Sequence, residues 1–166
     1  MQGELAIIRR IIDEHQSIRE HMKLVGDSVS DQEALATLRE THADLIPGRS
    51  DVLSERYKRV QQSISYLDDG LKNHFAFEEQ ALPAFLGELL IRGLVLEHLE
   101  ISKEIDKARA VIAETEAEGL SREQLLSKDA DMQQLVDNIR HSVEEHALKE
   151  EAILEMIERA LEEKRM

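Results

Sequence analysis

Four stretches of this chain carry an apolar stripe at helical spacing, and histidine or histidine with glutamate interrupts each stripe near its middle. Successive members lie three or four residues apart, which keeps their side chains on one face of an α-helix. The interrupting residues are His15 in the first stripe, His74 and Glu78 in the second, His98 in the third, and His146 and Glu150 in the fourth. Because unpaired charge in a helical core costs several kcal/mol per group, the pattern predicts a metal site shared by four helices.

The apolar members define four main helices. They are Ile8, Ile11, Ile18, Met22 and Val25; Val60, Ile64, Leu67, Leu71, Leu82 and Phe85; Ile91, Leu94, Ile101, Ile105, Ala108 and Ile112; and Leu135, Ile139, Val143, Ile153 and Ile157. We expect main helices over about 3–25, 50–85, 87–118 and 121–166, and a short extra helix within an insertion at about 28–50. The first helix is expected to stop near Gly26-Asp27-Ser28, and Pro83 falls in the last turn of the second. The predicted fold is all-α, an up-down-up-down four-helix bundle.

The composition favours long helices and excludes several classes of protein. Charged residues make up 34% of the chain, aromatic residues only 3%, and there are two prolines. The absence of cysteine excludes disulfides, iron–sulfur clusters and thiol catalysis. The net charge of −14 argues against nucleic acid as a partner, because neutralising phosphates requires a basic face.

The length fits one domain over residues 1–166, with a core large enough to be stable without disulfide cross-links. No apolar run approaches the roughly 20 residues of a membrane span, and the N-terminus lacks a signal-peptide pattern. We therefore expect a soluble, cytoplasmic protein with no membrane partner; the sequence names no protein partner.

The polar residues on the stripes fall at one level of the expected bundle. His74 lies 13 residues before the chain reversal near Gly87, and His98 lies 11 residues after it. At ~1.5 Å per residue these positions are about 20 Å and about 17 Å from the turn. From the next reversal near Gly119, His98 lies about 32 Å away. His146 lies about 28–37 Å away, depending on whether the fourth helix starts at Ser127 or at Ser121. The second, third and fourth helices therefore bring these residues to one height, as a single internal site requires.

Two of the helices carry the spacing H-x-x-x-E, which places an imidazole and a carboxylate on one face about 6 Å apart. One such pair can hold one metal ion or span two neighbouring ions. Four imidazoles and two carboxylates favour iron and then manganese, whereas zinc is less favoured with so many ligands and no thiolate.

The segments DEHQSIREHM, NHFAFEEQALPAF, LEHLEISKEI and EHALKEEAIL resemble the hemerythrin family, especially its H-H-E cation-binding branch. The resemblance covers all four main helices. It implies a non-haem centre of two iron ions, joined by an oxo or hydroxo bridge, that binds O₂, NO or peroxide for carriage, sensing, iron handling or the response to oxidative stress. It implies a binding protein more than a dedicated enzyme. By matching, His15 and His74 serve one iron, His98 and His146 serve the other, and Glu78 and Glu150 bridge them.

The chain departs from the oxygen-carrying hemerythrins at two points. Those proteins carry H-x-x-x-H on the third helix, whereas the residue four after His98 is Ser102. They also end with H-x-x-x-x-D, whereas this chain has His146 and Glu150. Both changes weaken the case for reversible oxygen carriage.

Other polar residues lie near the expected site in sequence. His21 and His141 lie off the stripes and are expected at the surface. His42 either packs on the apolar face of the inserted helix or reaches the site as a lid or extra ligand. Four glutamates adjoin the proposed ligands, point about 100° away from them, and are expected to be solvated. They are Glu14, Glu79, Glu97 and Glu151, of which Glu79 has the alternative of accepting a hydrogen bond from a ligand.

Two other functions are compatible with a helical bundle of this composition. A di-iron oxidase like ferritin or rubrerythrin uses Glu-x-x-His pairs. The residues three before the histidines of this chain include no glutamate; they are Ile12, Ile18, Arg39, Leu71, Val95, Asn138 and Val143. The remaining alternative is a metal-free helical interaction module. Metal analysis of the purified protein distinguishes this module from the two metal-binding functions.

Ser102 generates a first prediction. Without an imidazole at this position both ions keep an open coordination position, so we expect the ferrous protein to oxidise quickly and largely irreversibly in air while still binding azide or NO. Ser102→His should slow this oxidation, because position 102 lies one turn from His98 on the same face. Optical spectra recorded during exposure to air test this. A long-lived, reversible oxygen complex of the unmodified protein would contradict it.

Overall fold

The computed structural model describes residues 2–29, 49–117 and 122–164, and the regular structure within these ranges is entirely helical. The elements are the α-helices α1 (Gln2–Val29), α3 (Arg49–Ala81), α4 (Glu88–Ala117) and α5 (Arg122–Glu163), with a short 3₁₀ helix η1 (Leu82–Ala84). The predicted all-α bundle is confirmed, while the short extra helix and His42 fall outside the described residues. Of the helices described, none combines the length and apolar character needed to cross a membrane.

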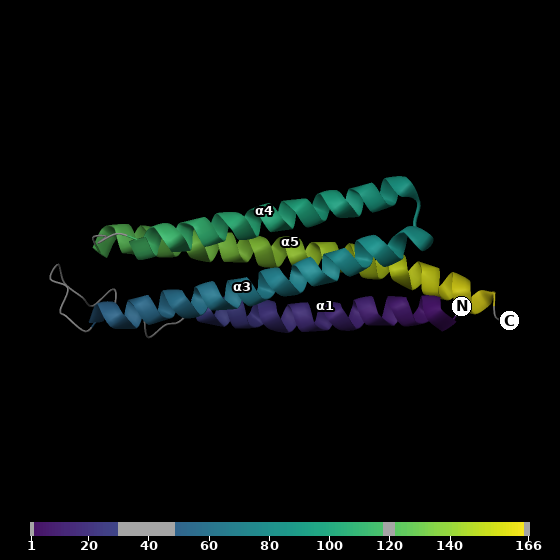
Figure 1. Ribbon diagram of the computed structural model, residues 1–166, viewed down its shortest axis with the longest axis horizontal. Helices are drawn as coiled ribbons and strands as arrows, with labels where there is room; N and C mark the ends of the chain where they lie inside the picture. The colour runs from purple at the N-terminus through teal and green to yellow at the C-terminus, as the bar shows by residue number, and fades with distance from the viewer. Residues whose placement is uncertain (1, 30–48, 118–121, 165–166) are drawn as a thin grey trace.

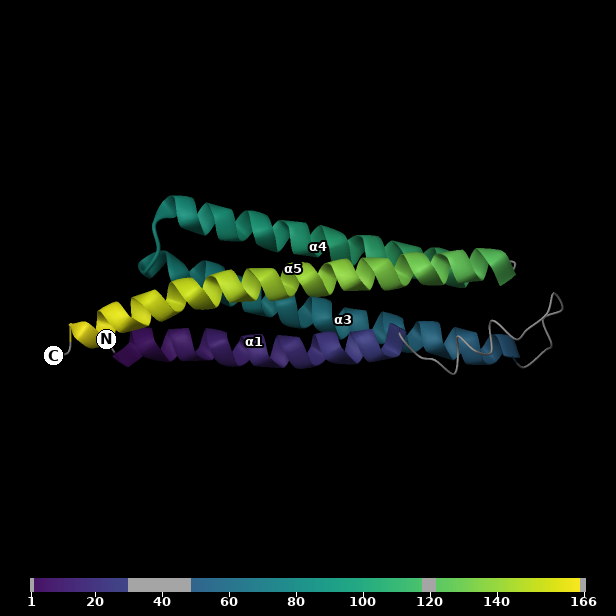
Figure 2. The same ribbon diagram turned by 180° about the vertical axis from the view of Figure 1, so that it is seen from behind.

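The four long helices lie side by side, and each runs antiparallel to the next one along the chain (Figure 1, Figure 2). α1 packs against α3 and α5, and α4 packs against the same two helices, so the four form a square in cross-section. The turn between η1 and α4 is tight: the amides of Phe85 and Leu86 both donate to the carbonyl of Leu82, at 2.9 and 3.0 Å. Such a short connection places α3 and α4 as antiparallel neighbours.

The core consists of two apolar clusters with a polar layer between them. The smaller cluster contains Ile8, Ile11, Leu82, Leu94 and Leu154. The larger one includes Ile18, Leu71, Ile101, Ile105 and Val143 among its buried side chains. On α1 the polar layer falls at His15, between Ile11 and Ile18. Apolar packing on both sides therefore separates this layer from the ends of the bundle.

Two helix ends differ from the sequence prediction. α1 continues through Gly26 and ends at Val29, one residue beyond the stop expected near Gly26-Asp27-Ser28. Val25 is only 1% exposed, so its packing stabilises a turn in which glycine costs about 1 kcal/mol. α3 ends at Ala81 and not at Phe85, because Pro83 has no amide hydrogen to continue the α-helical ladder and the chain tightens into η1.

The last part of the fourth stripe also differs from the prediction. Ile153 and Ile157 are only partly buried, whereas Leu154 is fully buried. From the inward-facing Glu150, a step of four residues turns about 40° from the core direction and a step of three turns about 60°. Leu154 therefore points more directly inward than Ile153.

A buried carboxylate links α3 to α4 away from the polar layer. Asp68 is 2% exposed and accepts hydrogen bonds from Arg109 at 2.8 Å and Lys72 at 2.9 Å. Arg109 also donates to the hydroxyl of Ser65 at 3.0 Å. These contacts offset part of the cost of burying the carboxylate of Asp68.

A matched pair of substitutions on α4 tests this packing. Ile105 is 1% exposed and Leu99 is 53% exposed. Ile105→Ala should lower the free energy of unfolding by about 2–5 kcal/mol, since it leaves a cavity in the core. Leu99→Ala should change it by no more than about 0.5 kcal/mol. Urea denaturation at one fixed metal loading measures both, and equal losses would mean that the face of α4 is misassigned.

Candidate metal centre

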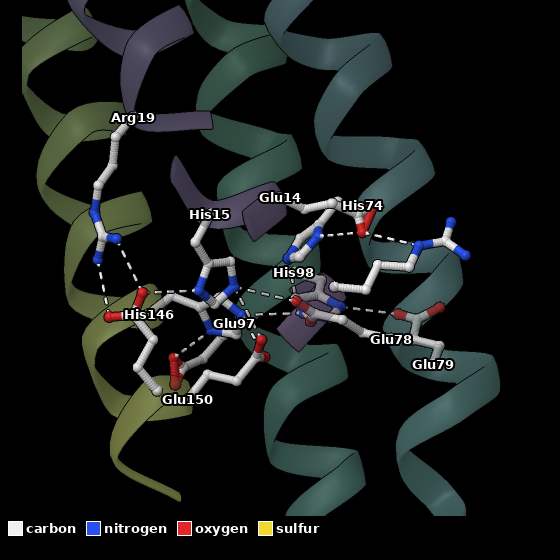
Figure 3. Close-up of polar contacts among 12 residues, drawn as sticks. Glu14, His15, Arg19, His74, Glu78, Glu79, Glu97, His98, His146 and Glu150 are labelled. Atoms are coloured by element: carbon white, nitrogen blue, oxygen red, sulfur yellow. Dashed lines mark hydrogen bonds and ion pairs between the residues drawn. The ribbon is translucent and has the colours of Figure 1, made fainter. Parts of the chain in front are cut away.

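The structure brings the six predicted site residues together in the polar layer. His15 comes from α1, His74 and Glu78 from α3, His98 from α4, and His146 and Glu150 from α5 (Figure 3). All six are at most 3% exposed. The helical periodicity that buries the apolar stripe also turns these side chains inward, so the same faces that form the core supply the donor atoms.

Each of the two buried glutamates reaches more than one histidine. The Oε1 atom of Glu78 lies beside the Nε2 atoms of His74 and of His15, the latter at 3.4 Å, while its Oε2 atom is 3.1 Å from Nε2 of His98. Glu150 places Oε1 at 3.1 Å from Nε2 of His15 and Oε2 at 3.3 Å from Nε2 of His146. The two oxygens of each carboxylate therefore face different histidines.

The donor atoms fall into two overlapping groups that share both carboxylates. One group contains His15 and His74 with Glu78 and Glu150, and the other contains His98 and His146 with the same glutamates. Within each group, one donor atom from every residue lies within 4.8 Å of the others. Among the described residues these are the groups of buried acidic and imidazole side chains arranged to hold metal ions.

Several atoms of this layer have no hydrogen-bond partner in the described structure. They are both carboxylate oxygens of Glu150, Oε2 of Glu78, and both ring nitrogens of His74. Imidazole nitrogens lie close to these oxygens, but between the two buried carboxylates and the four rings the described structure has one hydrogen bond, from Nε2 of His15 to Oε1 of Glu78 at 3.4 Å. A buried polar atom without a partner costs about 1–3 kcal/mol, and more if it is charged. Metal ions satisfy such atoms, because carboxylate oxygens and imidazole nitrogens are common ligands.

A second set of glutamates lies behind the histidines. The Nδ1 atom of each histidine faces a carboxylate on a neighbouring helix, at 3.2 Å from His15 to Glu151, 3.1 Å from His98 to Glu79, 3.2 Å from His146 to Glu97, and 3.7 Å from His74 to Glu14. The first three are hydrogen bonds and the last is an ion-pair contact. We refer to these four residues as the outer glutamates.

The outer glutamates were expected to be solvated, and the structure corrects this for Glu14, Glu97 and Glu151, whereas Glu79 accepts from His98 as in the alternative given for it. Their side chains are only 23–42% exposed. Each directly precedes or follows a residue of the buried layer in sequence, so it points about 100° away from the centre and toward the adjacent helix. Each of the four helices has a glutamate directly next to a residue of the buried layer, and this pattern is the sequence signal for the outer glutamates.

The outer glutamates decide which ring nitrogens face the centre as acceptors. A carboxylate beside Nδ1 accepts a hydrogen bond from the Nδ1–H group, so in the metal-bound centre we assign the ring proton to Nδ1 and the metal-binding lone pair to Nε2. The Nε2 atoms of His98 and His146 are 3.1 Å apart. At this distance a proton on one of the two atoms forms a hydrogen bond to the other when no metal is bound, and a metal cation takes the place of that proton.

The charges of the layer are strongly coupled. Burial alone lowers the pKa of His15, but the carboxylates of Glu150 and Glu78 outweigh it and raise this pKa to about 10. Burial raises the pKa of Glu78, but the surrounding imidazoles hold it far below its ordinary value. Burial likewise lowers the pKa of His146, and the carboxylate of Glu150 raises it overall. The centre therefore favours ionised carboxylates with positive charge beside them, which metal cations also supply.

Apolar side chains enclose the imidazoles. The ring of Phe75 stacks on His98 with centroids 3.8 Å apart and an interplanar angle of 8°. A small apolar cavity, with room for about one water-sized molecule, adjoins His15, His74 and His146 and is walled by Phe75 and other core residues. These contacts limit the access of water and leave room beside the centre for a very small ligand.

The remaining histidines of the described chain lie away from the centre. His21 is exposed and donates from Nδ1 to the carbonyl of Ser17 at 2.9 Å. His141 is also exposed, 3.7 Å from the carboxylate of Glu145. Both positions agree with the expectation of surface residues.

Comparison with known proteins gave one finding. The family model of the hemerythrin HHE cation binding domain matches residues 6–157. The match spans the four long helices and all six residues of the buried layer. No curated protein and no solved structure matched the chain.

The shared carboxylates generate a prediction about metal content. Glu150→Gln should reduce bound Zn²⁺ to at most one ion per chain, or weaken the second ion at least about tenfold (~1.4 kcal/mol), because both donor groups lose charge. Glu155→Gln is the matched control, since Glu155 is a 67% exposed residue of α5 that pairs with Arg159. Zinc analysis after dialysis measures both. Equal zinc content in the two variants would show that Glu150 does not contribute to binding.

Proposed function

The chain belongs to the hemerythrin HHE cation-binding family, and we propose that it is a hemerythrin-like protein whose centre holds two iron ions and binds O₂, NO or peroxide. Its role is sensing, iron handling or the response to oxidative stress. The observation that carries this proposal is the pair of buried glutamates whose two oxygens face different histidines. A carboxylate in this orientation suits two neighbouring ions.

The donor groups divide the ligands between the two ions. We assign His15 and His74 to the first position and His98 and His146 to the second, with Glu78 and Glu150 shared. Mixed imidazole and carboxylate donors favour iron and then manganese, and the two carboxylates offset part of the charge of two cations. The outer glutamates accept hydrogen bonds from Nδ1 of His15, His98 and His146, and so hold Nε2 of these rings toward the metal positions.

The surroundings of the centre support a small ligand. Bound ferrous iron supplies the electrons and the open coordination position that a diatomic molecule needs. Six protein side chains for two ions leave positions that the protein itself does not fill, and Ser102 has no imidazole with which to fill one. The apolar cavity beside His15 and His146 has room for about one water-sized molecule, so it is too small for an organic substrate. Phe75 and the neighbouring core residues limit the water that reaches this space.

Iron content and stability test the proposal together. Reconstitution with ferrous iron under argon should give about two ions per chain. Removal of the metal should lower the melting temperature, because the core must then hold two buried carboxylates without their counter-charge and binding stabilises the folded state. Iron analysis and calorimetry before and after chelation measure these effects. Absence of metal after reconstitution, with an unchanged melting temperature, would favour the metal-free interaction module instead.

A further inference from the structure

The outer glutamates differ in the cations that stand behind them. Glu151 is held by Arg19 through two parallel hydrogen bonds, from Nη1 to Oε1 at 2.9 Å and from Nη2 to Oε2 at 3.0 Å (Figure 3). The Nε atom of Arg19 also donates to Glu144 at 3.0 Å, so the guanidinium is fixed in the groove between α1 and α5. Arg19 is only 25% exposed. A bidentate pair of this kind is strong and geometrically specific.

Glu14 also has an arginine behind it. The Nε atom of Arg10 is 3.5 Å from Oε2 of Glu14, the oxygen that faces His74. The guanidinium of Arg10 lies over the ring of Phe77, 3.7 Å from the ring centroid, which restricts its movement. A positive charge therefore stands behind the carboxylates that serve both His15 and His74.

The other two outer glutamates have one lysine between them. Within the described part of the chain, Glu79 has no lysine or arginine partner and accepts only from His98. Glu97 faces the ammonium of Lys149 at 3.5 Å, the same distance as that from Arg10 to Glu14; Lys149 is 56% exposed and Arg10 is 60% exposed, and Lys149 is also shared with Glu145 at 3.9 Å. The two donor groups therefore differ in their cations: two arginines, one of them bound to Glu151 through two hydrogen bonds, stand behind the carboxylates that serve His15 and His74, and one exposed lysine stands behind those that serve His98 and His146.

This division changes how strongly each histidine donates to a metal. A carboxylate that accepts the Nδ1 proton makes Nε2 a better electron donor. A guanidinium bound to the same carboxylate draws its electron density away and cancels its charge at the centre. The His98 and His146 side therefore combines stronger imidazole donors with a more negative surrounding.

We propose that the two metal positions are unequal and that this outer layer sets the order in which they fill. The position of His98 and His146 takes a divalent cation first and holds it more tightly. The position of His15 and His74 fills second and releases its ion first, and Arg19 and Arg10 act as positioning residues that weaken it. The inference rests on the two-ion centre of the proposed function and gives that centre one exchangeable ion.

Stepwise titration of the metal-free protein with Co²⁺ tests the order of filling. Calorimetry gives the affinity of each step, and proton NMR detects the shifted Nδ1–H resonance of each histidine bound to Co²⁺. Repulsion between the ions makes the second step weaker even when the positions are equal. The test therefore depends on which histidines bind the ion at each step. A resonance that moves in Glu79→Gln belongs to His98, and one that moves in Glu14→Gln belongs to His74. At one equivalent of Co²⁺ we expect to see the signal of His98 and no signal from His74.

Variants of the outer layer should act on different steps. Glu79→Gln should weaken the first step by about 10-fold or more, whereas Glu14→Gln should weaken the second by a similar factor. Arg19→Gln should tighten the second step, and Arg19→Lys should leave it close to that of the unmodified protein because the charge remains. Arg92→Gln is the control, since Arg92 is a 69% exposed residue that pairs with Glu88 and should change neither step.

The outcomes separate this inference from the function it rests on. Binding of fewer than two Co²⁺ ions would overturn the two-ion centre and the inference with it. Two bound ions, with signals from His74 and His98 growing together at one equivalent, would overturn the inference alone. Weaker binding of the second step in Arg19→Gln would also overturn it, because Arg19 would then act as a brace for Glu151.

Discussion

The balance of charge around two buried carboxylates governs this structure. Glu78 and Glu150 have no measurable exposure and lie in a layer bounded on both sides by apolar side chains. Ionised carboxylates in such surroundings require positive charge within a few ångströms. The four imidazoles direct one nitrogen each toward this layer, and the nearby donor atoms form two groups in which metal ions would complete the balance.

The charges alternate outward from the centre. The carboxylates face imidazoles, the imidazoles face outer glutamates on the next helix, and two of those glutamates face arginines. The contacts close a ring around the bundle: His15 on α1 reaches α5, His146 on α5 reaches α4, His98 on α4 reaches α3, and His74 on α3 reaches α1. The ring requires each helix to contact two neighbours, which the square packing of the bundle provides.

The family and the site together describe a cation-binding bundle whose symmetry is incomplete. Every helix contributes at least one imidazole to the layer, but α3 and α5 alone contribute the shared carboxylates. The arginines also lie on one side, since both come from α1. A nearly fourfold arrangement thus has distinct electrostatic surroundings for its two donor groups, which an internal site in a symmetric bundle would not have.

The sequence by itself determined the helices, their inward faces and the set of six side chains that meet in the buried layer. These features depend on helical periodicity, which is local: His15, His98 and their counterparts fall on the same stripe as the apolar residues and must point with them. The tertiary structure decided the partners of the outer glutamates. A residue about 100° from the stripe, such as Glu151, points between helices, and whether it meets water, His15 or Arg19 depends on which helix packs beside it and at what height. Periodicity fixes the direction of a side chain from its own helix, but only the packing of a second helix fixes what that side chain contacts.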